Sequence, residues 1–471
     1  MKTLKHNLFL ALITSLLFTA CSDKKTEGLF IKNGQQIALI GGNLGSRMIE
    51  YGYFETAFQQ SFPDKQVVIR NMCDPGDTPG LRPQPGRETG WAFPGAENFQ
   101  TLLAENTDSE GHFEYPDEWL TRLQSELIIG FFGGVESFSG KEGLENFKRE
   151  LEAFILHTHK QKYNGKDTAR LVLVSPIAME DLSDRQDVPA GLEANENLAM
   201  YTTAMEQISA KHNVPFVNLF GKSKEWYKQG QHTIDGLQLN EKGYQKLTDE
   251  VMAQLFGLSY KAEEETDQLV RTAVLEKNWY WLKDYKIPNG VHAYGRRYEP
   301  FGPDNYPEEI MKTRQMTVIR DSAIWDALKG EIKDLETADK NTYKLSEVST
   351  NYDLENNSVE YLYGDDALAK FTLPEGYKIE LFASEEDFPD LANPVQMSFD
   401  GKGRLWVSVM PTYPAYKPGD PRPNDKILIF EDTDSDGKAD KQSIFAENLH
   451  LPLGFELAEE GVYVSQAPHL K

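Results

Sequence analysis

The feature that most constrains this chain is an alternation of short apolar segments with longer amphipathic ones between residues 33 and 258. The mostly apolar segments are residues 37–40, 67–70, 127–132, 171–174 and 214–217. Helix-like stretches lie between and after them, for example 143–159, 195–212 and 241–255. Continuously apolar strands that alternate with helices form a parallel sheet covered on both faces. We therefore expect an α/β three-layer sandwich with its ligand site at the carboxyl ends of the strands.

The first 32 residues precede this pattern and predict export. After a positive start, the apolar stretch 8–18 is too short to span a bilayer but suits a signal-peptide core. Small residues then lead into Cys21, and this junction resembles the lipobox of bacterial lipoproteins. We expect a signal peptide and lipobox at 1–21, a lipidated Cys21, a tether at 22–32, and an anchor on the periplasmic or cell-surface face of a bacterial membrane. The alternative is an ordinary signal peptide with an incidental cysteine.

The charge of the chain limits its binding partners, and its cysteine content limits its disulfides. The chain carries 74 acidic and 49 basic side chains, a net charge of −25, which repels phosphate backbones and argues against nucleic acid. Only one other cysteine exists, Cys73. If Cys21 carries lipid, Cys73 has no partner, and the fold cannot depend on a disulfide.

Three further stretches lie outside the alternating pattern. The loop 73–114 is rich in Pro, Gly and charge, and we expect it to cover the site or to be a disordered excursion. Its Trp91 and Phe93 are candidates for a surface on which a sugar stacks. Residues 259–336 predict a helical connector, with helices at 261–284 and 308–334 whose aromatic residues pack on a neighbour. A polar linker follows at 337–368.

From residue 369 to 471 the pattern changes to short alternating strands. They are expected at 377–382, 395–399, 404–409, 426–430 and 461–465, with a hairpin turn at 400–403. Antiparallel strands at this spacing indicate a β-propeller or a sandwich. About 100 residues supply one or two blades and a propeller needs about four, so we expect the first blades of a truncated propeller.

Four short blocks between residues 33 and 257 carry a family resemblance. They are Leu39-Ile40-Gly41-Gly42-Asn43-Leu44, Asn71-Met72-Cys73-Asp74-Pro75-Gly76-Asp77-Thr78, Phe132-Gly133-Gly134-Val135-Glu136-Ser137 and Asp235-Gly236-Leu237-Gln238-Leu239-Asn240. In order and spacing they resemble the Gly-Asp-Ser-Leu, Asn-x-Gly-x-x-Gly-x-Thr, Gly-x-Asn-Asp and Asp-Gly-x-His-x-Asn blocks of SGNH (GDSL-type) hydrolases. The resemblance implies a flavodoxin-like SGNH domain at 33–258. It also implies ester hydrolysis by Ser, His and Asp, with a Gly amide and an Asn side chain as oxyanion donors.

Three of the side chains that this chemistry requires are replaced. Asn43 stands in the nucleophile's place, Val135 in that of the oxyanion Asn, and Gln238 in that of the base. An amide is no nucleophile, an isopropyl group donates no hydrogen bond, and Gln cannot accept and return a proton near neutral pH. Asp235 alone remains of the triad. The sequence therefore predicts an SGNH scaffold without its esterase chemistry, a pseudoenzyme.

Neighbouring residues offer few substitutes. Ser46 lies three residues after the nucleophile position, where a residue of the first helical turn is the simpler interpretation. Cys73 stands in the place of the oxyanion Gly, and together with Gly133 it forms the predicted oxyanion region. For Cys73 itself, a buried structural cysteine is favoured over a reactive thiol. Glu136 is expected to fix the geometry of its loop, and His232 to lie on a loop surface.

Further stretches resemble large multidomain proteins of planctomycetes, verrucomicrobia and bacteroidetes. In the amino-terminal half these are Arg47-Met48, Tyr53-Phe54-Glu55-Thr56, Tyr163-Asn164-Gly165-Lys166 and Leu173-Val174-Ser175-Pro176-Ile177-Ala178. Leu381-Phe382-Ala383-Ser384-Glu385, Asn393-Pro394-Val395-Gln396-Met397 and Gly403-Arg404-Leu405-Trp406-Val407 resemble the opening of their "membrane-bound dehydrogenase" propeller. The resemblance implies a polysaccharide-degradation setting. It implies a haem group only if a domain with Cys-x-x-Cys-His lies downstream, because residues 1–471 contain no such motif.

One stretch of the third region has the spacing of a calcium loop. It begins Asp-x-Asp-x-Asp-Gly, like an EF-hand, but position 12 is Ser443 rather than a bidentate Glu. The candidate ligands are Asp432, Asp434, Asp436, Lys438 and Asp440. The alternative is an acidic hairpin turn between strands.

Three functions remain open at this point. The leading one is an exported lipoprotein whose degenerate SGNH-like domain binds a ligand, with glycans as candidates. The first alternative is an esterase for acylated carbohydrate with a rearranged site. The second is a sugar dehydrogenase that transfers electrons through propeller and haem domains outside this sequence.

Overall fold

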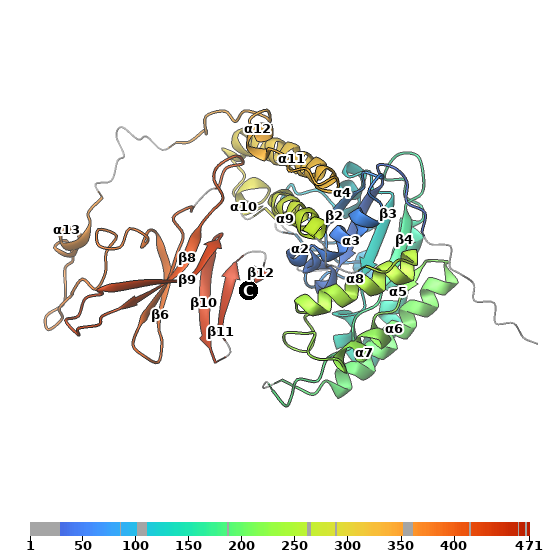
Figure 1. Ribbon diagram of the computed structural model, residues 1–471, viewed down its shortest axis with the longest axis horizontal. Helices are drawn as coiled ribbons and strands as arrows, with labels where there is room; N and C mark the ends of the chain where they lie inside the picture. The colour runs from blue at the N-terminus through green and yellow to red at the C-terminus, as the bar shows by residue number, and fades with distance from the viewer. Residues whose placement is uncertain are drawn as a thin grey trace, which may run out of the picture.

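The computed structural model describes residues 29–84, 86–100, 111–185, 188–260, 265–287, 290–351, 361–413, 416–459, 461–466 and 469–471 (Figure 1). The expected signal peptide, lipobox and Cys21 lie outside these residues. Within the described part, none of the helices is both long and apolar enough to cross a bilayer.

A five-stranded sheet forms the centre of the amino-terminal half. Its strands are β1 (Gln36–Gly41), β2 (Val68–Asn71), β3 (Leu127–Phe131), β4 (Arg170–Val174) and β5 (Phe216–Val217). All pairs are parallel, and the order is β2-β1-β3-β4-β5. This is the flavodoxin-like strand order, which places ligands at the carboxyl ends of the strands.

Helices cover both faces of this sheet. The larger ones are α3 (Tyr53–Ser61), α5 (Gly140–Thr158), α6 (Leu192–Lys211), α7 (Phe220–Tyr227) and α8 (Glu241–Phe256). Ile37 and Leu39 of β1 join a core cluster with residues of α3 and α8, whereas Ala38 and Ile40 join one with residues of α5 and α6. Both faces of the strands are therefore buried, which explains their continuous apolar sequence. The expected SGNH-like α/β sandwich is confirmed.

Short helices complete the amino-terminal half at its loops. They are α1 (Asn43–Ser46), α2 (Met48–Tyr51), α4 (Pro116–Arg122) and two 3-10 turns, η1 (Ala96–Asn98) and η2 (Glu136–Ser139). Helices α1 and α2 follow β1, and η2 follows β3. All three border the carboxyl edge of the sheet.

A helical unit follows and packs on the edge of the sheet beside β2 (Figure 1). It consists of α9 (Glu265–Tyr285), α10 (Gly290–Ala293), α11 (Gly302–Ala327) and α12 (Leu335–Asp339). Helix α11 begins six residues before the expected start and ends seven before the expected end at 334, since Gly330 takes a left-handed φ of +79° that interrupts the helix.

Buried polar contacts fix this helical unit to the sheet. Lys277 Nζ lies 2.6 Å from Glu55 Oε2, with both side chains buried, and Trp281 Nε1 donates to the carbonyl of Asn71. Arg70 of β2 and Asp321 of α11 form a buried, two-pronged ion pair. Trp281 and Tyr285 of α9 join the core of the α/β domain, where Trp281 meets Trp119 edge-on, whereas Trp279 packs against Tyr416 of the carboxy-terminal region.

The described part of the loop 73–114 packs against the α/β domain instead of presenting aromatic rings. Phe93 is buried and stacks on His157 of α5, and Thr78 Oγ1 donates to Glu150 of the same helix. The expected sugar-stacking surface at Trp91 and Phe93 is therefore wrong for Phe93, because α5 already covers its ring. Trp91 is half-buried and packs against the same core cluster.

Two antiparallel sheets make up the carboxy-terminal region, which the short helix α13 (Gly364–Leu368) precedes. A four-stranded meander contains β6 (Pro394–Phe399), β7 (Leu405–Val409), β8 (Asp425–Glu431) and β9 (Lys441–Leu449) in that order. A second sheet contains β10 (Pro452–Ala458), β11 (Gly461–Gln466) and β12 (His469–Leu470). The turn at 400–403 joins β6 to β7 as expected, with Asp400 N–H donating to the Arg404 carbonyl.

The strand expected at 377–382 is absent. Tyr377 is exposed, whereas Phe382 packs against the face of the meander beside Val407 and Phe430. Residues 377–380 are all exposed, so the alternating sequence there neither pairs as a strand nor packs, and only the end of the segment at Phe382 lies on the sheet face.

Candidate functional site

A cavity of about 910 Å³ lies at the carboxyl ends of β1, β3 and β4. The loops that follow these strands supply most of its wall. The remainder comes from η2, the start of α6, the loop after β2, the loop at 237–238 and Leu470 of β12. All three replaced positions of the family motif, Asn43, Val135 and Gln238, line this one cavity. The structure therefore brings together the positions that the sequence singled out.

A tight turn after β1 positions the nucleophile residue. Gly41 has a φ of +113°, and a Cβ there would lie 2.2 Å from the Phe131 carbonyl oxygen, so only glycine fits. Gly42 N–H donates to the same carbonyl at 2.8 Å, and Asn43 then opens α1 at the cavity. The geometry of a nucleophile turn is present, but its side chain is an amide.

Hydrogen bonds on both sides hold the residue in the base position. Gln238 Nε2 donates to Asp235 Oδ2 at 2.8 Å, and Gln238 Oε1 accepts from Arg47 Nη1 at 3.0 Å. Asp235 Oδ1 also accepts from the backbone N–H groups of Leu237 and Gln238. An Asp–Gln–Arg chain thus stands where SGNH hydrolases have Asp–His–Ser, and its amide neither accepts nor releases a proton near neutral pH.

The backbone amide in the oxyanion position is already engaged. Cys73 N–H donates to Asn71 Oδ1 at 2.9 Å, and Asn71 Nδ2 donates to the Gly45 carbonyl. The thiol of Cys73 is free and buried, and burial raises its pKa well above the ordinary value. Such a thiol is a poor nucleophile because little of it is thiolate.

The loop after β3 keeps its shape without its oxyanion side chain. Gly133 has a φ of +89°, and its N–H donates to Glu136 Oε2 at 2.8 Å. Glu136 is buried, and desolvation raises its pKa to about 8. This carboxyl group bonds the backbone of its own loop, while Val135 presents a half-exposed isopropyl group to the cavity.

Ser46 also lines the cavity, beside a buried cation. Its Oγ is 3.5 Å from Lys286 Nζ, which itself lies 2.8 Å from Asp74 Oδ1. The shorter contact of Lys286 is thus the ion pair with Asp74, and Ser46 lies at the limit of hydrogen-bond distance from the same Nζ.

His232 is buried, and the expectation that it lies on a loop surface is wrong. Its ring Nδ1 lies 2.7 Å from the Gly230 carbonyl oxygen. The loop folds inward because Glu180, itself buried, accepts from the N–H groups of His232 and Thr233. These contacts hold the loop that carries Asp235.

Two contributors to the site were missed at the sequence level. Arg47 supplies the cation that completes the Asp–Gln–Arg chain, and Phe138 supplies an aromatic ring, 73% exposed, at the cavity. Glu50 pairs with Arg47 at 3.6 Å, which balances the charge of that guanidinium. The sequence did contain a signal for Arg47, because this arginine lies about one helical turn after Asn43.

The acidic loop of the carboxy-terminal region connects β8 and β9. Carboxylate oxygens of Asp432, Asp434 and Asp440 all lie within 4.8 Å of one another. Asp436 is outside this group, and its Oδ1 accepts from the N–H of Lys438. Asp432 accepts from three backbone N–H groups of the turn, at 435–437. The grouping brings three of the five expected ligands together, in a hairpin.

Comparisons with known proteins cover the two halves separately. A domain family of unknown function, DUF7133, matches residues 364–471. No curated protein matches the chain. Among solved structures, a catalytic mutant of an acetylxylan esterase from Geobacillus stearothermophilus is similar, at 13% identity and a TM-score of 0.34, covering 50% of this chain and 100% of its own.

A lipase/acylhydrolase from Enterococcus faecalis is similar at 15% identity and a TM-score of 0.31, over 49% of this chain and 100% of its own. The α/β fold of this half is established by the strand order of the chain itself.

Proposed function

We propose that the SGNH-like domain binds a ligand in its strand-end cavity without cleaving it. The bonding of Gln238 carries this proposal, because its amide is held between Asp235 and Arg47 and replaces a proton-transferring imidazole. The occupied Cys73 amide and the Val135 side chain support it, since both weaken oxyanion capture.

A glycan is the proposed ligand. Polar side chains that can bond hydroxyl groups line the cavity beside exposed apolar ones, and Phe138 offers a ring on which the apolar face of a sugar can stack. The polar side chains include Asn43, Arg47, Asn197 and Gln238. In this proposal the chain is an exported lipoprotein, tethered through Cys21 to a bacterial membrane.

The test measures turnover and retention on the same full-length protein. We expect no hydrolysis of p-nitrophenyl acetate or acetylated xylan above the uncatalysed rate, and retention of the protein on a glycan array. Phe138→Ala should weaken retention, and Tyr377→Ala, an exposed tyrosine far along the chain, should not. Ester cleavage by the parent protein that disappears in a folded Asp235→Asn variant, which keeps an acceptor oxygen for the turn, would refute the non-catalytic assignment.

A restored variant sharpens this test. Asn43→Ser, Val135→Asn and Gln238→His together return the family's functional groups to a turn and loop that have kept their shape. We expect measurable esterase activity from the triple variant and none from any single one, because a triad acts as a unit.

A rearranged esterase is the second candidate, and the contact between Ser46 and Lys286 is the observation that favours it. It predicts that Ser46→Ala abolishes ester cleavage while Ser137→Ala, another cavity serine, leaves it intact. The pairing of Lys286 with Asp74 speaks against it.

The carboxy-terminal region is proposed to be the first part of a propeller. Its four-stranded meander has the strand pattern of a blade and packs through Trp406 against Phe455 and Val464 of the next sheet. Under this proposal, sugar dehydrogenase activity would require further blades and a haem domain. A reading frame that continues past Lys471 into Cys-x-x-Cys-His would support it, and a stop codon there would exclude it.

A further inference from the structure

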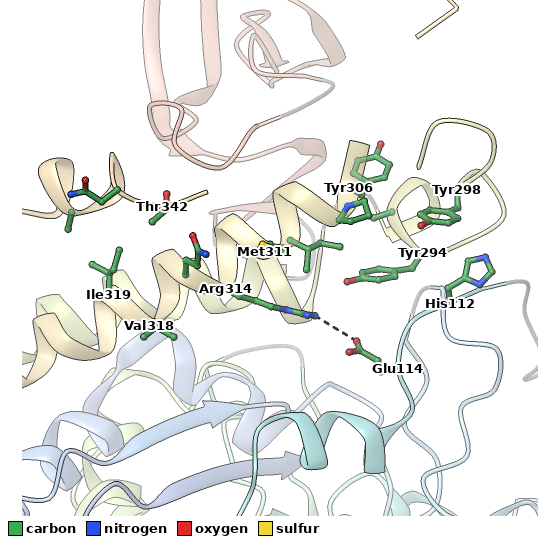
Figure 2. A pocket seen from close by; sticks show the side chains of 16 residues that line it. His112, Glu114, Tyr294, Tyr298, Tyr306, Met311, Arg314, Val318, Ile319 and Thr342 are labelled. Atoms are coloured by element: carbon green, nitrogen blue, oxygen red, sulfur yellow. Dashed lines mark ion pairs between the residues drawn. The ribbon is translucent and has the colours of Figure 1, made fainter. Parts of the chain in front are cut away.

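A second cavity, of about 830 Å³, lies on the helical unit away from the strand-end cavity. Figure 2 shows its lining along one side of α11, with α12 at one end and the loop residues His112 and Glu114 at the other. None of the SGNH motif positions lines it, so it is a separate site.

Aromatic side chains gather at one end of this groove. Tyr294, Tyr298 and Tyr306 lie there with His112, as Figure 2 shows. The rings of His112 and Tyr298 have centroids 5.1 Å apart and are tilted by 57°. Tyrosine presents an apolar face together with a hydroxyl group, a combination that suits a ligand with both apolar and hydroxylated surfaces.

The positive and negative charges of the groove wall balance one another. Arg314 lies 3.9 Å from Glu114 in the groove wall and bonds Asp284 through its Nε. Arg122, behind them, pairs with the same two carboxylates. Two cations facing two anions leave no net charge to attract an ionic ligand, and the chain as a whole carries −25. The groove therefore suits an uncharged ligand.

The groove is long and its floor is partly apolar. The lining residues of α11 run from Tyr306 to Ile319, which at 1.5 Å per residue is about 20 Å. Met311 and Val318 on this stretch are 48% and 63% exposed, so the floor presents apolar side chains to solvent. The far end is polar, with Asn341 and Thr342 beyond α12.

Hydrogen bonds hold the walls in place without filling the groove. His112 N–H donates to the Tyr294 carbonyl at 2.7 Å, which ties the loop to the segment after α10. Lys312 Nζ donates to Thr342 Oγ1 at 2.7 Å, which ties the polar end to α11. A groove with fixed walls binds with a smaller entropic loss than one that must form around its ligand.

We infer that this groove binds a neutral, linear oligosaccharide. Its rings contact the tyrosine end, its hydroxyl groups bond the balanced charges of Arg314 and Glu114, and its length follows α11. An extended peptide fits less well, because the groove floor is a helix whose backbone groups are bonded within it, so they cannot pair with a peptide backbone.

The test titrates the full chain with cellohexaose, xylohexaose, mannohexaose and laminarihexaose by calorimetry, with hexagalacturonate as the anionic comparison. We expect saturable binding of at least one neutral sugar and none of the anionic one. Tyr298→Ala should raise Kd about tenfold or more, and Val318→Gln, an exposed position that leaves folding intact, about threefold. Tyr377→Ala is the matched control.

A cavity variant keeps this inference separate from the function proposed above. Retention of sugar that is lost in Phe138→Ala but unchanged in Tyr298→Ala and Val318→Gln would place the ligand in the strand-end cavity and overturn the groove assignment. Absence of binding to every neutral sugar in the panel would overturn it as well. So would binding of a peptide library that Tyr298→Ala abolishes while no sugar binds.

Discussion

The ion pair between Arg70 and Asp321 offers a direct measure of how the helical unit is attached. The two residues lie 251 positions apart in the sequence, and two hydrogen bonds of 2.8 and 2.5 Å join them. Their side chains are 7% and 5% exposed, and the guanidinium lies 5.4 Å from the centre of the Trp281 ring. The perturbation is Asp321→Leu, which leaves the arginine charge buried and unpaired.

The expected cost follows from burial. Removing one partner of a buried pair destabilises a protein by about 3–5 kcal/mol, because the remaining charge has lost both water and its counter-ion. The double variant Arg70→Met with Asp321→Leu should recover most of this loss, since apolar side chains of similar volume often replace a buried pair without cost. Glu336→Gln breaks the exposed pair with Lys340 and should change nothing measurable.

The assay is urea unfolding of the full chain, followed by tryptophan fluorescence and by hydrogen exchange of α9 and α11. Trp281 lies against the pair and reports on it. A stability of Asp321→Leu within about 1 kcal/mol of the parent protein would refute the reasoning, because an unpaired buried guanidinium cannot be that inexpensive. Failure of the double variant to recover would show that the pair's hydrogen bonds, and not its burial, set the cost.

Three further outcomes are expected. The raised pKa of Glu136, about 8 against an ordinary 4.5, means that the native state keeps a proton that the unfolded state releases, so stability should fall as pH rises between those values. Glu136→Gln should remove that part of the dependence in urea midpoints at pH 5 and pH 8.5. Cys73 should resist a thiol reagent until the protein unfolds; rapid native labelling would contradict its burial. Gly41→Ala should lose about 2–4 kcal/mol in thermal unfolding, since its Cβ would collide with Phe131. Gly34→Ala, with open space and a φ of +68°, should lose only about 1 kcal/mol.

The sheet could be predicted because its signal is local. Strands β1, β3 and β4 of the α/β domain are largely apolar on both faces, so a short window of sequence suffices to find them. Strand β9 was missed because most of its residues are exposed or half-exposed, which leaves no apolar period. Strand β10 carries a proline and a glycine that resemble a turn. Residues 377–382 have an alternating pattern but form no strand, and only Phe382 of the segment packs against the meander.

The site was predictable in its identities but not in its bonding. Motif spacing alone placed Asn43 and Gln238 in the cavity. The contact between Gln238 and Arg47 joins residues 191 positions apart. A contact between such distant residues produces no local pattern from which a single sequence could predict it. The groove on α11 was missed for the same reason, because four separate segments contribute to it.

The persistence of Asp235 has an explanation that does not involve catalysis. Its carboxylate caps the turn by accepting from the N–H groups of Leu237 and Gln238, and it faces the Gln238 amide with the Arg47 guanidinium beyond. An apolar residue would leave those N–H groups unbonded, at a cost of about 1–3 kcal/mol each where they are buried. Asp235 therefore shapes the loop through these hydrogen bonds. For the same reason, a destabilised Asp235→Ala variant would say nothing about ester chemistry unless Asp235→Asn, which keeps an acceptor oxygen, were folded and equally inactive.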